Sequence, residues 1–309
     1  MIKLLLAFIL IFVAAFSSQA QQVPQYSQWF WHLQALNPAF SGIKPCLEIK
    51  TLYRNQWANL PGSPNSGFIT LNLPISTPQK KLLSPRQGIG FKFETDKIGA
   101  FSMNRFLVNY AAHFNFTTET RLSVGISGGV KQWVFDRDKM TTFETDPVLQ
   151  QSASFIRPDA ALGAWWNGKN YFLSFSMSEL IRSKWNPLTA DSRYQIHSYF
   201  GAGTRFTLNE KFTLLPYILL RFPPKGPVSM DVNAILSYKN KIDIGLGLRN
   251  TDAVNLLLQY KFDEKFSIAY SMDYILSDLA NSTHFSHEFS LMFGSCKSRN
   301  TNKTVCPLF

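Results

Sequence analysis

The stretch from Val254 to Tyr274 reads VNLLLQYKFDEKFSIAYSMDY and decides the fold class. Apolar side chains occupy every second position on both sides of a short polar turn at Asp263-Glu264. The apolar set is Val254, Leu256, Leu258, Tyr260, Phe262, Phe266, Ile268, Tyr270, Met272 and Tyr274. Successive side chains of a strand point to opposite faces, so this alternation predicts two antiparallel strands joined by a tight turn. The apolar face would pack in the core of a soluble sandwich, or against lipid in a transmembrane barrel.

The same alternation recurs in about fourteen segments, which are separated by turn residues. They are approximately 47–55, 67–75, 87–95, 104–117, 121–135, 157–166, 169–177, 194–207, 211–222, 227–238, 241–249, 252–262, 265–275 and 284–293. Several of them reach ten residues or more, whereas the mean soluble strand has about five or six. A tilted transmembrane strand needs about nine to eleven residues. Segment length therefore favours an all-β transmembrane antiparallel barrel over a soluble sandwich.

Composition supports the same fold class. Aromatic residues make up 15% of the chain, with 27 Phe and 11 Tyr, and charged residues only 17%. A typical soluble domain has roughly 25% charged residues, and lipid-facing strands with aromatic girdles shift composition in the observed direction. The longest later apolar stretch, Leu214 to Leu220, is interrupted by Pro216. It is far shorter than the roughly 18 to 20 residues of a transmembrane helix.

The N-terminus predicts export. Lys3 gives a positive start, Leu4 to Phe16 form an unbroken apolar run, and Ser18-Gln19-Ala20 supplies small residues at a cleavage site. This pattern is typical of a secretory signal peptide over residues 1–20. The net charge of +11 comes from scattered Lys and Arg residues. The absence of a basic cluster argues against nucleic-acid binding.

The connections between segments predict the orientation of the barrel. Short turns alternate with longer connections around 56–66, 136–156 and 178–193. Outer-membrane barrels have short periplasmic turns and long extracellular loops, so these three loops are expected outside the cell. Residues 76–86 and 250–251 depart from the rule. An even strand count places both termini in the periplasm.

Residues 21–46 do not alternate, and two interpretations of them stay open. The segment contains Gln25 to Trp31 and then Asn37-Pro38-Ala39-Phe40-Ser41-Gly42. It is either a periplasmic arm or a plug tucked into the barrel. We favour the plug, because four aromatic side chains would otherwise be exposed. Asn37, Pro38 and Gly42 are its candidate motif residues.

Several short motifs resemble those of the PorP/SprF family, in the order and spacing of that family, over about residues 21 to 293. The N-terminal ones are Gln25 to Gln28, Asn37 to Gly42 and Tyr53-Arg54-Asn55-Gln56-Trp57. The later ones are Arg157-Pro158-Asp159, Tyr270 to Tyr274, Leu276-Ser277 and Ser286 to Leu291.

This resemblance implies an outer-membrane protein of the type IX secretion system, often linked to gliding motility. Members are similar to fatty-acid-channel barrels, with fourteen strands and an N-terminal plug. The implied partners are outer-membrane lipid, a large surface protein with a C-terminal sorting domain, and other type IX components at the periplasmic face. The alternative function is a transporter for a hydrophobic solute, which rests on analogy of fold alone.

The chain departs from the family pattern by continuing from Gly294 to Phe309, which we expect to be a periplasmic extension. That extension holds Cys296 and Cys306, and the third cysteine is Cys46. The first and last strands of a closed barrel pair, so a Cys46–Cys296 disulfide would close the seam at its periplasmic end. A local Cys296–Cys306 loop is the alternative, since short loops close readily.

Alternation also predicts charged side chains inside the barrel. They are Glu48, Lys50, Arg54, Asp273 and Glu288. We expect them to form a network that braces the wall and the plug; a polar permeation path is the alternative. His284 and His287 are three residues apart on a strand and point to opposite faces, so we expect no metal site. No nucleophile or phosphate-binding motif is present, and we expect neither catalysis nor a cofactor.

Overall fold

The computed structural model describes residues 23–75, 85–117, 119–139, 153–183, 195–224, 226–250 and 252–295. The predicted signal peptide, Cys296 and Cys306 lie outside these residues. None of the helices in the described ranges is long and apolar enough to cross a membrane.

Strands dominate the described chain. Their bounds are β1 Glu48–Asn55, β2 Asn65–Pro74, β3 Arg86–Ile98, β4 Phe101–Asn115, β5 Arg121–Phe135, β6 Ala153–Asn167, β7 Tyr171–Ser178, β8 His197–Thr204, β9 Phe206–Thr207, β10 Phe212–Phe222, β11 Ser229–Tyr238, β12 Ile242–Arg249, β13 Ala253–Lys261, β14 Phe266–Ile275 and β15 Phe285–Gly294. The helices are short: η1 Trp29–His32, α2 Leu33–Leu36, η2 Pro38–Phe40, η3 Arg137–Lys139 and η5 Asp278–Asn281.

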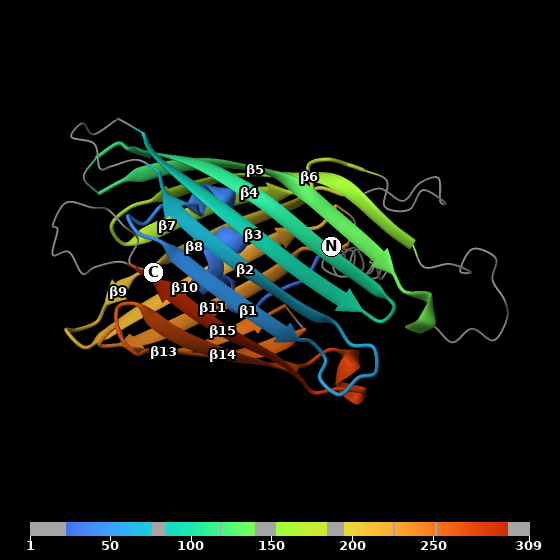
Figure 1. The fold of residues 1–309 in the computed structure, drawn as a ribbon. Coiled ribbons are helices and arrows are strands. Elements are labelled where there is room, and N and C mark those ends of the chain that lie inside the picture. The colour runs from blue at the N-terminus through green and yellow to red at the C-terminus, as the bar shows by residue number, and fades with distance from the viewer. Residues whose placement is uncertain are drawn as a thin grey trace, which may run out of the picture.

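These strands form one closed sheet (Figure 1). Apart from the short β9, each strand pairs antiparallel with its sequence neighbours, and β15 pairs with β1 to complete the ring. The two-residue β9 continues β8 past Arg205, and both pair with β10, so the fifteen strands form a fourteen-stranded wall. The predicted barrel and its strand number are confirmed.

The burial pattern of the wall follows the predicted alternation. In β13 Asn255 and Gln259 are buried, whereas Val254, Leu258 and Tyr260 are exposed. The exposed large side chains of the barrel are mostly apolar. Aromatic pairs cross neighbouring strands near both ends of the wall: Phe212–Tyr238, Phe266–Phe293, Phe101–Phe135 and Tyr274–Phe285. An apolar outer surface flanked by aromatic residues is the surface that a lipid bilayer requires.

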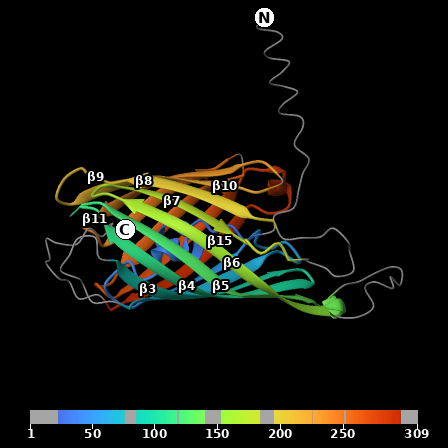
Figure 2. The same ribbon diagram turned by 90° about the horizontal axis from the view of Figure 1, so that it is seen from above.

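Several strand boundaries differ from the sequence prediction, notably between β3 and β4 and at the start of β6. β3 and β4 run on to a tight turn at Gly99-Ala100, because Gly99 adopts a φ of +56° that glycine tolerates easily. β6 begins at Ala153 rather than 157, since Phe135 pairs with Ala153 at the far end of the β5–β6 ladder. These strands have 13 to 15 residues, more than a membrane crossing needs. Figures 1 and 2 show β5 and β6 extending well past the ends of the shorter strands.

Residues 23–46, here called the lumenal segment, lie inside the barrel. Strand β3 shows their path. Close to its start, Gly88 approaches Gly42; further along, the Lys92 ammonium donates to the Ala35 carbonyl at 2.8 Å, and Glu94 accepts from the Tyr26 hydroxyl at 3.2 Å. The segment therefore runs along the wall for six residues of β3, about 20 Å at 3.3 Å per residue.

This path corrects the expectation that an even strand count places both termini in the periplasm, at the same end of the barrel. An even strand count does bring the start of β1 and the end of β15 to one end of the barrel, which we call the turn end. The lumenal segment, however, crosses from there to the opposite loop end, where Tyr26 meets Arg221 near the end of β10. Counting strands gives the position of the wall only. The start of the described chain therefore lies toward the loop end and not beside Ser295, where the described chain ends.

The β1–β15 seam bears on the predicted disulfide. Glu48 pairs with Gly294, and Leu47 and Ser295 exchange hydrogen bonds of 3.1 and 2.9 Å one position further. Cys46 is disulfide-bonded, and in a chain with three cysteines this is incompatible with the alternative Cys296–Cys306 loop. Both other cysteines lie outside the described residues. We propose Cys296 as its partner, because one more step of the same antiparallel register brings position 296 opposite Cys46.

Counting the free thiols distinguishes Cys296 from Cys306 as the disulfide partner of Cys46. Under denaturing, non-reducing conditions, we expect Cys296→Ser to carry one more maleimide-reactive thiol than the wild type. Cys306→Ser should carry one fewer, since it removes the free cysteine. Mass spectrometry of the labelled protein measures both. The reverse pattern would assign Cys306 to Cys46 and contradict the seam disulfide.

Candidate functional site

The lumenal segment is held to the wall by Asn37. Its side-chain amide donates to the Ala164 carbonyl at 2.9 Å, to the Ser174 hydroxyl at 2.9 Å and to the Phe175 carbonyl at 3.2 Å. The amide oxygen accepts from the N–H of Ala39 at 2.9 Å and so caps η2, with Pro38 at the start of that turn. A proline suits this position because the first N–H of a helical turn has no partner.

Glycines of the wall let the segment approach this closely. Gly125 and Gly163 pair across β5 and β6 directly beneath η2. A Cβ on Gly125 would lie 2.4 Å from the Ala39 nitrogen, and one on Gly163 would lie 2.0 Å from the Asn37 side-chain oxygen. Gly42, at a φ of +64°, meets Gly88 in the same way. The wall and the segment thus share a contact that only glycine permits.

Aromatic side chains fill the middle of the lumen. Phe30 stacks on Tyr217 with ring centroids 4.2 Å apart, and Trp29 meets the same ring edge-on at 5.0 Å. Phe40 meets Trp165 at 5.3 Å. All five are at most 4% exposed. Offset-stacked and edge-to-face pairs add to the stabilisation that burial gives, so the segment and the wall form one hydrophobic core.

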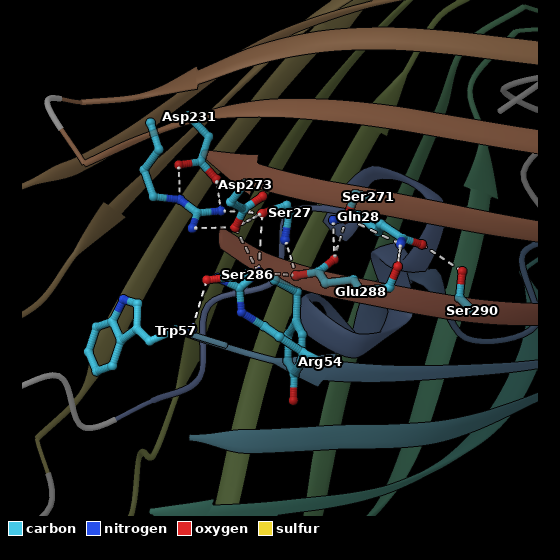
Figure 3. A network of polar contacts seen from close by, with 12 residues as sticks. Ser27, Gln28, Arg54, Trp57, Asp231, Ser271, Asp273, Ser286, Glu288 and Ser290 are labelled. Carbon is cyan, nitrogen blue, oxygen red and sulfur yellow. Dashed lines mark hydrogen bonds and ion pairs between the residues drawn. The ribbon is translucent and has the colours of Figure 1, made fainter. Parts of the chain in front are cut away.

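Nearer the loop end lies a group of buried ions that we call the Arg54 network (Figure 3). Arg54 contacts Asp273 at 2.8 Å and Glu288 at 2.5 Å. Three further members extend the network: Asp231 pairs with Arg221 at 2.7 Å and with Arg249 at 2.9 Å. Three cations therefore face three carboxylates, and all six are 7% exposed or less.

The Arg54 network also holds the start of the lumenal segment. Glu288 accepts from the backbone N–H groups of Ser27 and Gln28 at 2.7 and 2.9 Å. The Ser27 hydroxyl donates to Asp273 at 2.8 Å and accepts from Arg249 at 2.8 Å. Buried charges need both an opposite charge and hydrogen bonds. Here the segment supplies hydrogen bonds to Glu288, Asp273 and Arg249 of the wall, which lowers the cost of burying these charges.

A second group, the Arg105 network, lines the opposite wall. Arg105 contacts Asp159 at 2.5 Å and Glu94 at 3.7 Å, and Glu94 pairs with Lys92 at 2.9 Å. Lys131 forms a close ion pair with Glu179. This network also balances three cations against three carboxylates. Tyr26 links it to the segment through the hydroxyl bond to Glu94.

The five charged residues predicted for the lumen all point inward, but they do not form one group. Arg54, Asp273 and Glu288 meet in the Arg54 network. Glu48 and Lys50 lie toward the turn end, where Glu48 contacts Lys44 at 2.8 Å and Lys50 at 3.5 Å. Lys50 also donates to the Trp31 carbonyl at 2.9 Å.

The sequence reasoning missed half of the Arg54 network and the whole Arg105 network. Asp231, Arg249 and Asp159 stand at inward positions of alternating strands, so strand periodicity alone contained the signal. Glu179 gave no such signal, because a φ of +58° turns its side chain inward against the alternation. In the described ranges, no three His, Cys, Asp or Glu side chains are grouped to hold a metal ion.

Comparison with known proteins identifies the family. The model for "Type IX secretion system membrane protein PorP/SprF" matches residues 18–293. The chain belongs to the PorP/SprF family. It is therefore an outer-membrane β-barrel of the type IX secretion system, as the sequence motifs predicted. No curated protein is significantly similar to the chain.

Solved outer-membrane barrels are similar to the chain only at low sequence identity. The Acinetobacter baumannii outer membrane protein Omp33 is 8% identical, with 82% of this chain and 99% of that chain covered and a TM-score of 0.47. The translocator domain of the autotransporter NalP from Neisseria meningitidis is 11% identical, with 86% and 94% covered and a TM-score of 0.44. A TodX monoaromatic hydrocarbon channel mutant is 8% identical, with 84% and 92% covered and a TM-score of 0.45.

Proposed function

We propose that this barrel is non-enzymatic and helps to export large proteins with a C-terminal sorting domain, or holds them at the cell surface. It would act within the type IX secretion and gliding motility apparatus. Family membership over residues 18–293 is the observation that carries this proposal. The lumen supports it, because its centre is occupied by the chain's own aromatic side chains and paired charges.

Recognition in this proposal belongs to the loop end, since loops tolerate variation and carry binding specificity. Residues 56–66, 136–156 and 178–193 are the candidate loops, and the structure describes all of the first and parts of the other two. The loop at 56–66 is anchored to β15 by two hydrogen bonds. The Trp57 N–H donates to the Ser286 hydroxyl at 2.9 Å, and the Ala58 N–H donates to the Phe285 carbonyl at 2.8 Å. Other type IX components would meet the barrel at the turn end.

Deleting the gene and profiling the surface proteins tests the function. We expect one or a few large proteins with a C-terminal sorting domain to disappear from the surface. Complementation with the wild-type gene should restore them, which controls for effects on neighbouring genes. An unchanged surface profile together with impaired uptake of a lipid would instead favour a transporter for a hydrophobic solute.

A further inference from the structure

Polar side chains interrupt the apolar outer surface of the wall near its loop end. His287, Asn55 and Asn65 stand opposite one another on the adjacent strands β15, β1 and β2. Each follows or precedes a buried residue of its own strand, so alternation turns all three side chains outward. Lys97 on β3 pairs with Asn65, continues the row and is exposed. We call these four residues the outer polar row.

The outer polar row lies at the edge of the hydrocarbon layer. On β15, His287 is two residues from Phe285, which forms the loop-end aromatic pair with Tyr274. Two residues of a strand span about 7 Å, so the row sits just below the aromatic residues of this end. Polar side chains are costly at this depth unless they find partners, because hydrocarbon offers no hydrogen bonds.

The wall meets only part of this need. The Asn65 side-chain oxygen accepts from the Tyr53 hydroxyl and from the Asn55 amide, both at 2.8 Å. His287 Nδ1 and the Tyr270 hydroxyl share a hydrogen bond of 2.9 Å. Among the described residues, neither His287 Nε2 nor the Lys97 ammonium has a hydrogen bond or an ion pair. The outer polar row therefore has nitrogen atoms available to a molecule outside the wall.

An apolar groove adjoins the outer polar row on the side facing the turn end. Its volume is about 690 Å³, and Tyr53, Phe289 and Tyr270 form its border with the row. Thr51 is the smallest outward side chain that lines it. The Thr51 hydroxyl donates to the Leu291 carbonyl at 3.4 Å, so the wall satisfies this hydroxyl and the groove stays apolar.

The row and the groove together match one lipid molecule. His287 and Leu291 are four residues apart on β15, about 13 Å along the strand. One leaflet contributes half of a hydrocarbon core that is roughly 30 Å thick. A lipid of the loop-end leaflet can thus place its headgroup at the row and an acyl chain in the groove. The positive charge of Lys97 complements a phosphate, and hydrogen bonds to a phosphate are stronger than those between neutral groups.

We propose that the outer polar row and the adjoining groove bind a phosphate-bearing lipid of the leaflet at the loop end. The lipid would lie on the outer face of the wall, so this inference is independent of the proposed function, which concerns the lumen and the loops. The row crosses the β15–β1 seam (Figure 1). A lipid bound there would hold together the two strands at which the barrel closes.

Native mass spectrometry of the full chain, purified in detergent and freed of lipid, tests the site with three probes. Dioleoylphosphatidylglycerol carries a phosphate and acyl chains, dioleoylglycerol carries the chains alone, and glycerol phosphate carries the phosphate alone. We expect one phosphatidylglycerol to bind per barrel. The other two probes should bind at least about tenfold more weakly, which is the factor that one lost hydrogen bond to a charged group gives.

Two variants locate the lipid on the wall. Thr51→Phe fills the groove and leaves the outer polar row intact, and His287→Leu removes the ring nitrogens from the row. Each should bind phosphatidylglycerol about tenfold more weakly than the wild type. Val130→Phe adds the same ring to an exposed position of β5 and should bind like the wild type. Heat-modifiable electrophoretic mobility reports whether each variant is folded.

Equal binding of phosphatidylglycerol by folded Thr51→Phe and by the wild type would overturn the proposal. Equal binding of dioleoylglycerol and phosphatidylglycerol would overturn it too, because the row would then recognise no headgroup. A photo-crosslinking residue at Leu291 in the native outer membrane should link to lipid. A link to a second copy or to another protein instead would assign the groove to that partner and contradict the lipid site.

Discussion

Replacing Arg54 by Met is expected to destabilise the barrel by about 3–5 kcal/mol, the range for breaking a buried ion pair by removing one partner. Arg54 is 2% exposed and touches both Asp273 and Glu288, so the change leaves two buried carboxylates without their shared cation. Equilibrium unfolding in urea, followed by heat-modifiable mobility in the same detergent, measures the loss.

Two further variants control this result. Lys169→Ala removes a cation from the exposed Lys169–Glu119 pair, whose atoms are 3.7 Å apart, and should cost under about 1 kcal/mol. Adding Asp273→Asn to the Arg54 variant should recover part of the lost stability, because neighbouring charges in one network are coupled. A cost for Arg54→Met no larger than that of Lys169→Ala would show that the network does not stabilise the fold.

Replacing Gly125 by Val is expected to drive the lumenal segment off the wall. Its Cβ would lie 2.4 to 2.6 Å from backbone atoms of Pro38 and Ala39, which cannot move aside as the end of a flexible side chain can. Overpacking of this kind typically costs about 1–3 kcal/mol. In planar bilayers we expect the variant to conduct ions steadily and the wild type to stay closed.

Gly128 on the same strand supplies the matched control. A Cβ there meets nothing within 4 Å, so Gly128→Val should behave like the wild type in conductance and in stability. If folded Gly125→Val also stays closed, the segment is not what fills the lumen. If the wild type already conducts, the barrel is an open pore.

The sequence was sufficient to predict the wall of the barrel because strand alternation is a local property. Each inward or outward position depends only on its neighbours, and β5 was predicted at the bounds that the structure shows. The predicted boundary between β3 and β4 was wrong because one residue changed the backbone locally. Gly99 folded β3 directly onto β4, and no count of apolar positions contains its φ of +56°.

The interior was harder to predict because its contacts join distant parts of the chain. Ser27 and Asp273 are 246 residues apart, and Asn37 and Ser174 are 137 apart. Alternation shows that Asp273 faces inward, but it does not show which cation or which part of the lumenal segment it meets. The direction of that segment depended on such contacts too, which is why strand counting misplaced its start.

Purification of the full chain from its native outer membrane in mild detergent tests the central claim most directly. The account predicts that a large protein with a C-terminal sorting domain co-purifies in a fixed ratio and is identified by mass spectrometry. A lone barrel carrying bound lipid, recovered under conditions that keep other outer-membrane complexes intact, would contradict it.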